Sequence, residues 1–92
     1  MYTLKATSQF KKDLKKVKKQ ADNFKRTTEV LKLLQRNGHK AIPLEMRPHR
    51  LKGDYKDNWE CHIKPDLLII WFQMEDPNNI RLVRLGSHSD LF

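Results

Sequence analysis

Residues 59–73 read WECHIKPDLLIIWFQ, and this stretch contains two expected strands and the turn between them. Trp59 to Ile63 alternates apolar and polar side chains, which is the period of a strand with one buried face. Leu67 to Gln73 is a continuous apolar run, as in a strand buried in a core. Lys64-Pro65-Asp66 supplies the turn, so the stretch predicts an antiparallel strand pair.

More strands are expected on either side of this pair. Ile80 to Leu85 alternates again, after a turn at Asp76 to Asn79. Arg50 to Lys52 begins a strand ahead of Gly53. At the start of the chain, Tyr2 to Ala6 alternates in the same way.

Two helices are expected between the first strand and the rest. The first covers Gln9 to Ala21, is capped by Thr7 or Ser8, and has an apolar stripe of Phe10, Leu14, Val17 and Ala21. The second is capped by Asp22 or Asn23, ends at Asn37-Gly38, and has a stripe of Phe24, Thr27, Val30, Leu31 and Leu34. His39 to Arg50 shows no period and is expected to be a loop. The sequence predicts one α+β domain over residues 1–92, with the N-terminal strand and helical hairpin packed on a mainly antiparallel C-terminal sheet.

Composition narrows the class of protein. Hydrophobic residues make up 38% and charged residues 33% of the chain, as in soluble globular domains. The longest apolar run is far shorter than the roughly 20 residues of a membrane span, and the first residues lack an export signal. A single cysteine, Cys61, excludes an internal disulfide and agrees with a reducing compartment. We therefore expect a cytoplasmic protein without a membrane partner.

The formal charge of +8 indicates that a polyanion or an acidic protein is the partner. Much of this charge lies opposite the apolar stripe of the first helix, on Lys11, Lys12, Lys15, Lys16, Lys18 and Lys19. This lysine face, interrupted only by Asp13, is either a solvated helix surface or an anion-binding surface.

Candidate chemistry concentrates on the open face of the sheet. Glu60 and His62 are expected to point there because Cys61 and its apolar neighbours should face the helices. Cys61 and His62 then cannot share a zinc ion, and a core thiol is a poor nucleophile. The chain also lacks a glycine-rich phosphate loop, so we expect no metal and no cofactor.

Three blocks of residues resemble one family. His49 to Gly53, Glu60 to Asp66 and Arg84 to Phe92 are similar in order and spacing to the YafQ branch of the RelE/ParE toxin superfamily. The resemblance implies a RelE-like toxin of a type II toxin-antitoxin system. Such a toxin is a metal-independent endoribonuclease that cuts mRNA in the ribosomal A site, where a 2′-hydroxyl attacks the adjacent phosphate. Its protein partner is an acidic, DinJ-like antitoxin.

The resemblance also assigns the site. It implies that His49, His62, Asp66 and His88 are catalytic, and that Glu60, Arg84 and Phe92 line the substrate site. Histidine is suited to either proton transfer, and the sequence leaves open which one is base and which is acid. Arg84, placed on the same strand face as Ile80 and Leu82, is expected either to bind phosphate or to form a structural ion pair.

Two other functions fit the same residues. A ParE-like toxin of this fold binds a protein target without cutting RNA, and a basic nucleic-acid-binding module performs no chemistry at all. The set of histidines and aspartate favours catalysis, because a pure binder has no need of titratable groups gathered on one face.

Overall fold

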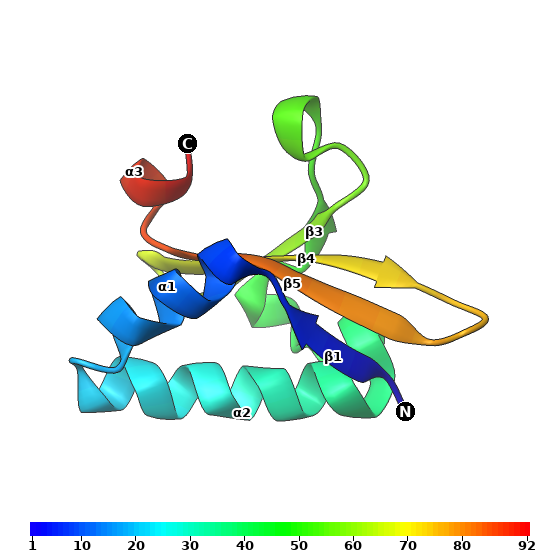
Figure 1. The fold of residues 1–92 in the computed structure, drawn as a ribbon, viewed down its shortest axis with the longest axis horizontal. Coiled ribbons are helices and arrows are strands. Elements are labelled where there is room, and N and C mark those ends of the chain that lie inside the picture. Colours follow the sequence, from blue (N-terminus) through cyan, green and yellow to red (C-terminus); the bar gives the residue numbers. More distant parts are fainter.

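The computed structural model describes residues 1–92 and contains a five-stranded sheet with the order β1-β5-β4-β3-β2 (Figure 1). The strands are β1 (Thr3–Ala6), β2 (His49–Arg50), β3 (Trp59–Lys64), β4 (Leu67–Met74) and β5 (Asn79–Gly86). The strands from β2 to β5 pair antiparallel, as predicted, whereas β1 runs parallel to β5 at one edge. The predicted α+β class is confirmed, and the sheet is mixed.

The helices are α1 (Ser8–Val17), α2 (Ala21–Asn37) and a short C-terminal α3 (His88–Leu91). Thr7 caps α1, because its hydroxyl accepts a hydrogen bond from the Phe10 N–H at 3.0 Å. The prediction that this helix extends to Ala21 is wrong, since residues 18–20 tighten into a turn. The predicted cap of α2 at Asp22 or Asn23 is also wrong, because both lie inside its first turn.

The expected loop from His39 to Arg50 carries local structure. It contains the 3₁₀ helices η1 (Gly38–Ala41) and η2 (Leu44–Met46) and then strand β2. The strand expected at Arg50 to Lys52 is therefore shifted toward the N-terminus, and a third 3₁₀ helix, η3 (Gly53–Tyr55), follows it. This shift places His49 inside the sheet, where its partner is fixed by strand register.

The main core lies between the sheet and the two long helices. Phe10 and Val17 of α1 and Val30 and Leu34 of α2 join one buried cluster with the side chains on the near face of the sheet, which include Cys61, Ile69, Trp71 and Leu85. Both long helices therefore cover the same face, as predicted. None of the helices is long and apolar enough to cross a membrane.

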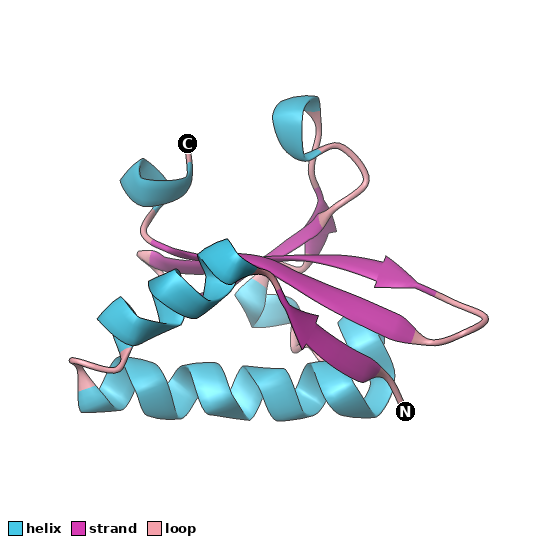
Figure 2. Cartoon of the chain, viewed as in Figure 1, coloured by secondary structure: helices cyan, strands magenta, loops and turns pink.

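The opposite face of the sheet, which we call the open face, carries only short segments. Figure 2 shows α3 and the η3 region rising from this side, away from α2. Leu91 of α3 packs there against Leu68 and Ile70, with Leu51 and Tyr55 at the margin of this smaller cluster. Glu60, Leu68 and Ile70 on this face are buried beneath these segments, whereas His49 and His88 remain exposed.

A β-bulge changes which side chains of β5 reach the open face. Trp71 pairs with Leu82 and Ile70 pairs with Arg84, so Val83 is an extra residue in β5. The expectation that Arg84 shares a face with Ile80 and Leu82 is therefore wrong. The Arg84 side chain leaves the sheet on the same face as the side chain of its partner Ile70. Because of the bulge, the next side chain, that of Leu85, lies in the main core.

Candidate active site

A lateral row across the sheet joins three of the candidate residues. His49 pairs with Glu60, Glu60 with Ile70, and Ile70 with Arg84. Directly paired residues point to the same face, so this row lies on the open face. The Nε2 atom of His49 lies 3.2 Å from Oε1 of Glu60, and its Nδ1 atom lies 2.7 Å from the carbonyl oxygen of Arg47.

The two members of the histidine and glutamate pair differ in exposure. The side chain of His49 is 47% exposed, whereas that of Glu60 is only 6% exposed. The second carboxylate oxygen of Glu60, Oε2, is buried and has no hydrogen-bond partner. The sequence correctly placed Glu60 on this face but did not anticipate its burial.

His62 lies one row further along the open face, opposite Leu68 of β4. Its Nδ1 atom is buried without a hydrogen-bond partner. The preceding residue, Cys61, points into the main core and is fully buried. Burial raises the pKa of the Cys61 thiol to about 12, with a smaller contribution from the nearby Glu60, so the thiolate is not available as a nucleophile.

Asp66 and His88 meet at the end of the sheet where β5 runs into α3. The Oδ1 atom of Asp66 accepts a hydrogen bond from the backbone N–H of His88 at 3.3 Å. Asp66 therefore contacts the main chain of His88 rather than its imidazole ring. His88 is exposed, and its ring lies 5.0 Å from the ring of Phe92 between centroids.

The C-terminal helix is held in place by its own cap. The Ser87 side chain accepts from the Asp90 N–H, and the Asp90 carboxylate accepts from the Ser87 N–H, which is a capping box. Phe92, whose side chain is one of the exposed large apolar groups, also meets Tyr55 edge to face with 5.6 Å between ring centroids. His88, Phe92 and Tyr55 thus form a continuous aromatic edge beside the site.

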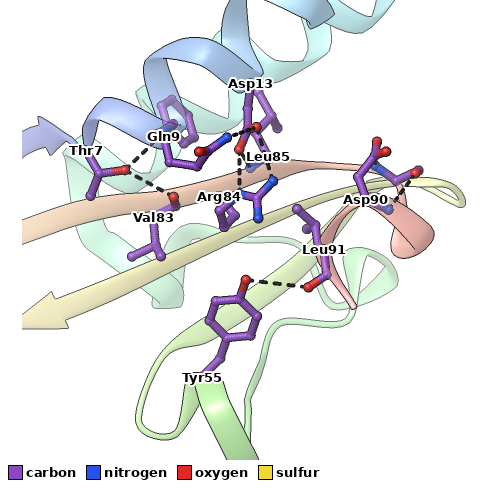
Figure 3. A network of polar contacts seen from close by, with 11 residues as sticks. Thr7, Gln9, Asp13, Tyr55, Val83, Arg84, Leu85, Asp90 and Leu91 are labelled. Atoms are coloured by element: carbon purple, nitrogen blue, oxygen red, sulfur yellow. Dashed lines mark hydrogen bonds and ion pairs between the residues drawn. The ribbon is translucent and has the colours of Figure 1, made fainter.

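Arg84 is committed to Asp13 of α1, as Figure 3 shows. Its Nε atom donates to Oδ2 of Asp13 at 2.9 Å and its Nη2 atom donates to Oδ1 at 3.3 Å. Asp13 also accepts from the backbone N–H of Leu85 and from Gln9. Burial raises the pKa of Asp13, but these hydrogen bonds outweigh it and hold the pKa below its usual value.

The structural ion pair that the sequence left open for Arg84 is therefore present. Its hydrogen bonds with Asp13 raise the pKa of Arg84, so the guanidinium is a permanent charge. Arg84 still lines a cleft of about 640 Å³ between α1, the turn after β3 and the start of α3. The same cleft is lined by Asp66, Lys16 and Lys64, so it adjoins the Asp66 and His88 end of the site.

The lysine face is solvent-exposed as expected, but Lys18 and Lys19 lie in the turn after α1 rather than on the helix. All six of its lysines are exposed, and Lys16 is the member that borders the cleft.

Sequence reasoning missed two residues of this region. Asp13 is buried, and a signal was present, because positions 10, 13, 14 and 17 share one side of a helix. Tyr55 had no signal, since it follows Gly53 in a polar turn whose position over the sheet depends on tertiary packing.

Ligand-type side chains do not gather into a metal site. No group of three or more histidine, cysteine, aspartate or glutamate side chains has a geometry that would hold a metal ion. Cys61 and His62 face opposite sides of the sheet, as their adjacent positions in a strand require.

Comparisons with known proteins agree on one group of relatives. The family described as "Bacterial toxin of type II toxin-antitoxin system, YafQ" matches residues 2–92. The mRNA interferase toxin YafQ of Escherichia coli K12 is 28% identical over 86 residues, which cover 94% of this chain and 90% of that protein. A metal-bound toxin from Helicobacter pylori is 40% identical, with a TM-score of 0.82 over the whole of both chains. The toxin chain of an E. coli DinJ-YafQ complex is 25% identical, with a TM-score of 0.84 over 100% of this chain and 99% of that one.

Proposed function

Because the chain belongs to the YafQ family of bacterial toxins from type II toxin-antitoxin systems, we propose that it is an mRNA interferase that inhibits translation. It cuts mRNA in the ribosomal A site, and an acidic antitoxin of the DinJ kind neutralises it. The resemblance noted in three sequence blocks and the family match over nearly the whole chain support the same assignment. A ribosome-directed activity places the protein in the cytoplasm.

The observation that carries this proposal is the gathering of acid-base side chains on one face. His49, Glu60 and His62 share the open face through strand register, and Asp66 and His88 meet at its end. Cleavage through a 2′-hydroxyl needs a base for that proton, an acid for the leaving oxygen, and positive charge near the phosphate. Histidine side chains supply both proton transfers in the physiological pH range. A protein that only binds has no use for this arrangement.

In this proposal, Arg84, Phe92 and the lysine face bind RNA or the antitoxin rather than transfer protons. Arg84, held by Asp13 at the cleft, contributes positive charge toward the phosphate, and the guanidinium N–H groups that Asp13 does not take are the donors left for RNA. Phe92 is exposed beside His88 and offers a surface on which a nucleobase stacks. The lysine face binds ribosomal RNA or the antitoxin, both of which are acidic.

The reaction proceeds without a metal ion in this proposal. The arrangement of ligand-type side chains supports it, since Cys61 and His62 diverge and no three-ligand cluster exists. The metal in the H. pylori relative makes a direct test worthwhile. Cleavage should persist when trace transition metals are removed by a chelator and Mg²⁺ is kept at the level that ribosomes need. Loss of activity that one added transition metal restores would contradict it.

Mapping of RNA 5′ ends in a translating extract tests the function itself. We expect new ends within open reading frames when the protein is added, and none when translation is blocked before initiation. The His88→Ala variant is the matched control. If the protein inhibits the growth of cells that express it but produces no new RNA ends in the extract, the result would instead support a ParE-like binder.

A further inference from the structure

The two ring nitrogens of His49 both face oxygen atoms that accept protons. Nδ1 lies 2.7 Å from the carbonyl oxygen of Arg47, which has no proton to give, so Nδ1 must be the donor. In a neutral ring, Nε2 would then carry a lone pair. That lone pair would lie 3.2 Å from a carboxylate oxygen of Glu60, which is a repulsive arrangement. A proton between Nε2 and Oε1 removes the repulsion.

The burial of Glu60 also requires a proton between Oε1 of Glu60 and Nε2 of His49. Its side chain is nearly fully buried. His49 is the one basic side chain within ion-pair distance of it, and Oε2 has no partner. An ionised carboxylate in this position without a cation or donor is strongly disfavoured. An imidazolium beside a carboxylate, or a neutral imidazole beside a carboxylic acid, each holds one proton between the two residues. Both descriptions give the pair one proton that it can transfer.

We infer that Glu60 is a positioning residue that keeps a transferable proton on His49, and that His49 is the general acid of RNA cleavage. This inference rests on the proposed function. The His49 side chain is 47% exposed, so a substrate can approach it, whereas Glu60 is buried and acts only through His49. The base is then one of the other candidates, His62, Asp66 or His88.

The proton balance of the step follows from this assignment. The base removes the proton of the 2′-hydroxyl, and the 2′-oxygen forms a bond to phosphorus. The bond between phosphorus and the 5′-oxygen breaks, and its electron pair goes to the 5′-oxygen. The Nδ1–H of His49 leaves the carbonyl oxygen of Arg47 and gives its proton to that 5′-oxygen, while the Nε2–H stays with Oε1 of Glu60. The products are a 2′,3′-cyclic phosphate and a 5′-hydroxyl. The pair of His49 and Glu60 recovers its proton from solvent.

An mRNA with sulfur in place of the 5′-oxygen at the cleaved bond tests the inference. A thiolate leaves without being protonated, so this substrate does not need the general acid. On natural RNA, His49→Ala should cut about 10² to 10⁴ times more slowly than wild type, and Glu60→Gln should also be slow. Glutamine has the same shape, but its amide donates to Nε2 and leaves the ring neutral. On the sulfur-substituted RNA, both variants should cut at close to the wild-type rate.

His88→Ala is the control, and it should remain slow on both substrates if His88 is the base or binds the phosphate. Persistent slowness of His49→Ala on the sulfur-substituted RNA would overturn the assignment of the acid. Normal cleavage of natural RNA by Glu60→Gln would overturn the role of Glu60. If melting shows that Glu60→Gln is unfolded, Glu60→Met removes the carboxylate at similar volume and the same two rates decide. A wild-type protein that cuts neither RNA would refute the proposed function instead.

Discussion

Replacement of the buried Asp13 by alanine should lower stability more than alanine replacement of any exposed residue of α1. The change leaves the buried N–H of Leu85 and the guanidinium of Arg84 without their acceptor. Loss of one partner from a buried ion pair costs about 3–5 kcal/mol, and an unsatisfied buried N–H costs about 1–3 kcal/mol. Because the Arg84 side chain is 23% exposed and water can solvate it after the change, the cost of the broken ion pair is reduced, and we expect a combined cost of about 3 kcal/mol.

We therefore expect Asp13→Ala to lose about 3 kcal/mol of the free energy of unfolding, which corresponds to a melting temperature about 12–24 °C lower. Urea unfolding followed by the fluorescence of the two tryptophans, the buried Trp71 and the partly buried Trp59, measures the change, with linear extrapolation to water. Asp22→Ala is the matched control. It removes an aspartate that also forms ion pairs, with Arg26 and Lys64, but the Asp22 side chain is exposed, so its loss should matter far less.

A pH series separates the charge of Asp13 from its shape. Because the pKa of Asp13 is held below 3.8 in the folded protein, its ionised form contributes stability that is fully present above that value. The contribution is lost as the pH falls through the lower folded pKa. Asp13→Asn should thus be clearly less stable than wild type at pH 7, and this gap should shrink below about pH 4. An Asp13→Ala variant within about 0.5 kcal/mol of wild type at pH 7 would refute the energetic reasoning.

Three further predictions concern single sites. His88→Ala should leave the melting temperature nearly unchanged and reduce cleavage by about 10² to 10⁴, and a variant that unfolds or cuts normally would contradict this. His88→Gln distinguishes hydrogen bonding from proton transfer, with ribosome binding measured for both variants. Replacement of several lysines of the lysine face by glutamine should weaken ribosome binding and reduce its salt dependence by about one unit of slope per lost phosphate contact, whereas an unaltered slope would make this face merely solvated. Cys61, with its pKa raised to about 12, should react with a thiol reagent only as fast as the protein opens, so rapid labelling of the native protein would contradict its burial.

Much of the fold followed from local pattern. Alternation in Trp59 to Ile63 and the apolar run after it predicted β3 and β4, and Cys61 and Glu60 were assigned to the correct faces. The ends of α1 and α2 were less well predicted, because Ala21 continues the apolar stripe although the chain turns before it. A turn between two helices depends on how they pack against the sheet, which a stripe of side chains does not encode.

The candidate site was identified residue by residue, but its contacts were not. The sequence named His49, Glu60, Asp66 and His88. It gave no reason to expect that the buried carboxylate of Glu60 contacts the His49 ring, or that Asp66 accepts a hydrogen bond from the backbone N–H of His88. Those contacts join different strands and turns. They are set by strand register and by the position of α3, both of which are tertiary features.

The sequence by itself determined the strand periods, the exposed lysine face and the family, because each depends on residues near one another along the chain. The tertiary structure alone decided the environment of Arg84. An extra residue at Val83 moves it to the open face, and Asp13, 71 residues away in the chain, takes two of its donors. A bulge is defined by pairing with the neighbouring strand, and a buried ion pair forms only where packing removes water from both partners. Neither condition can be read from residues in sequence order.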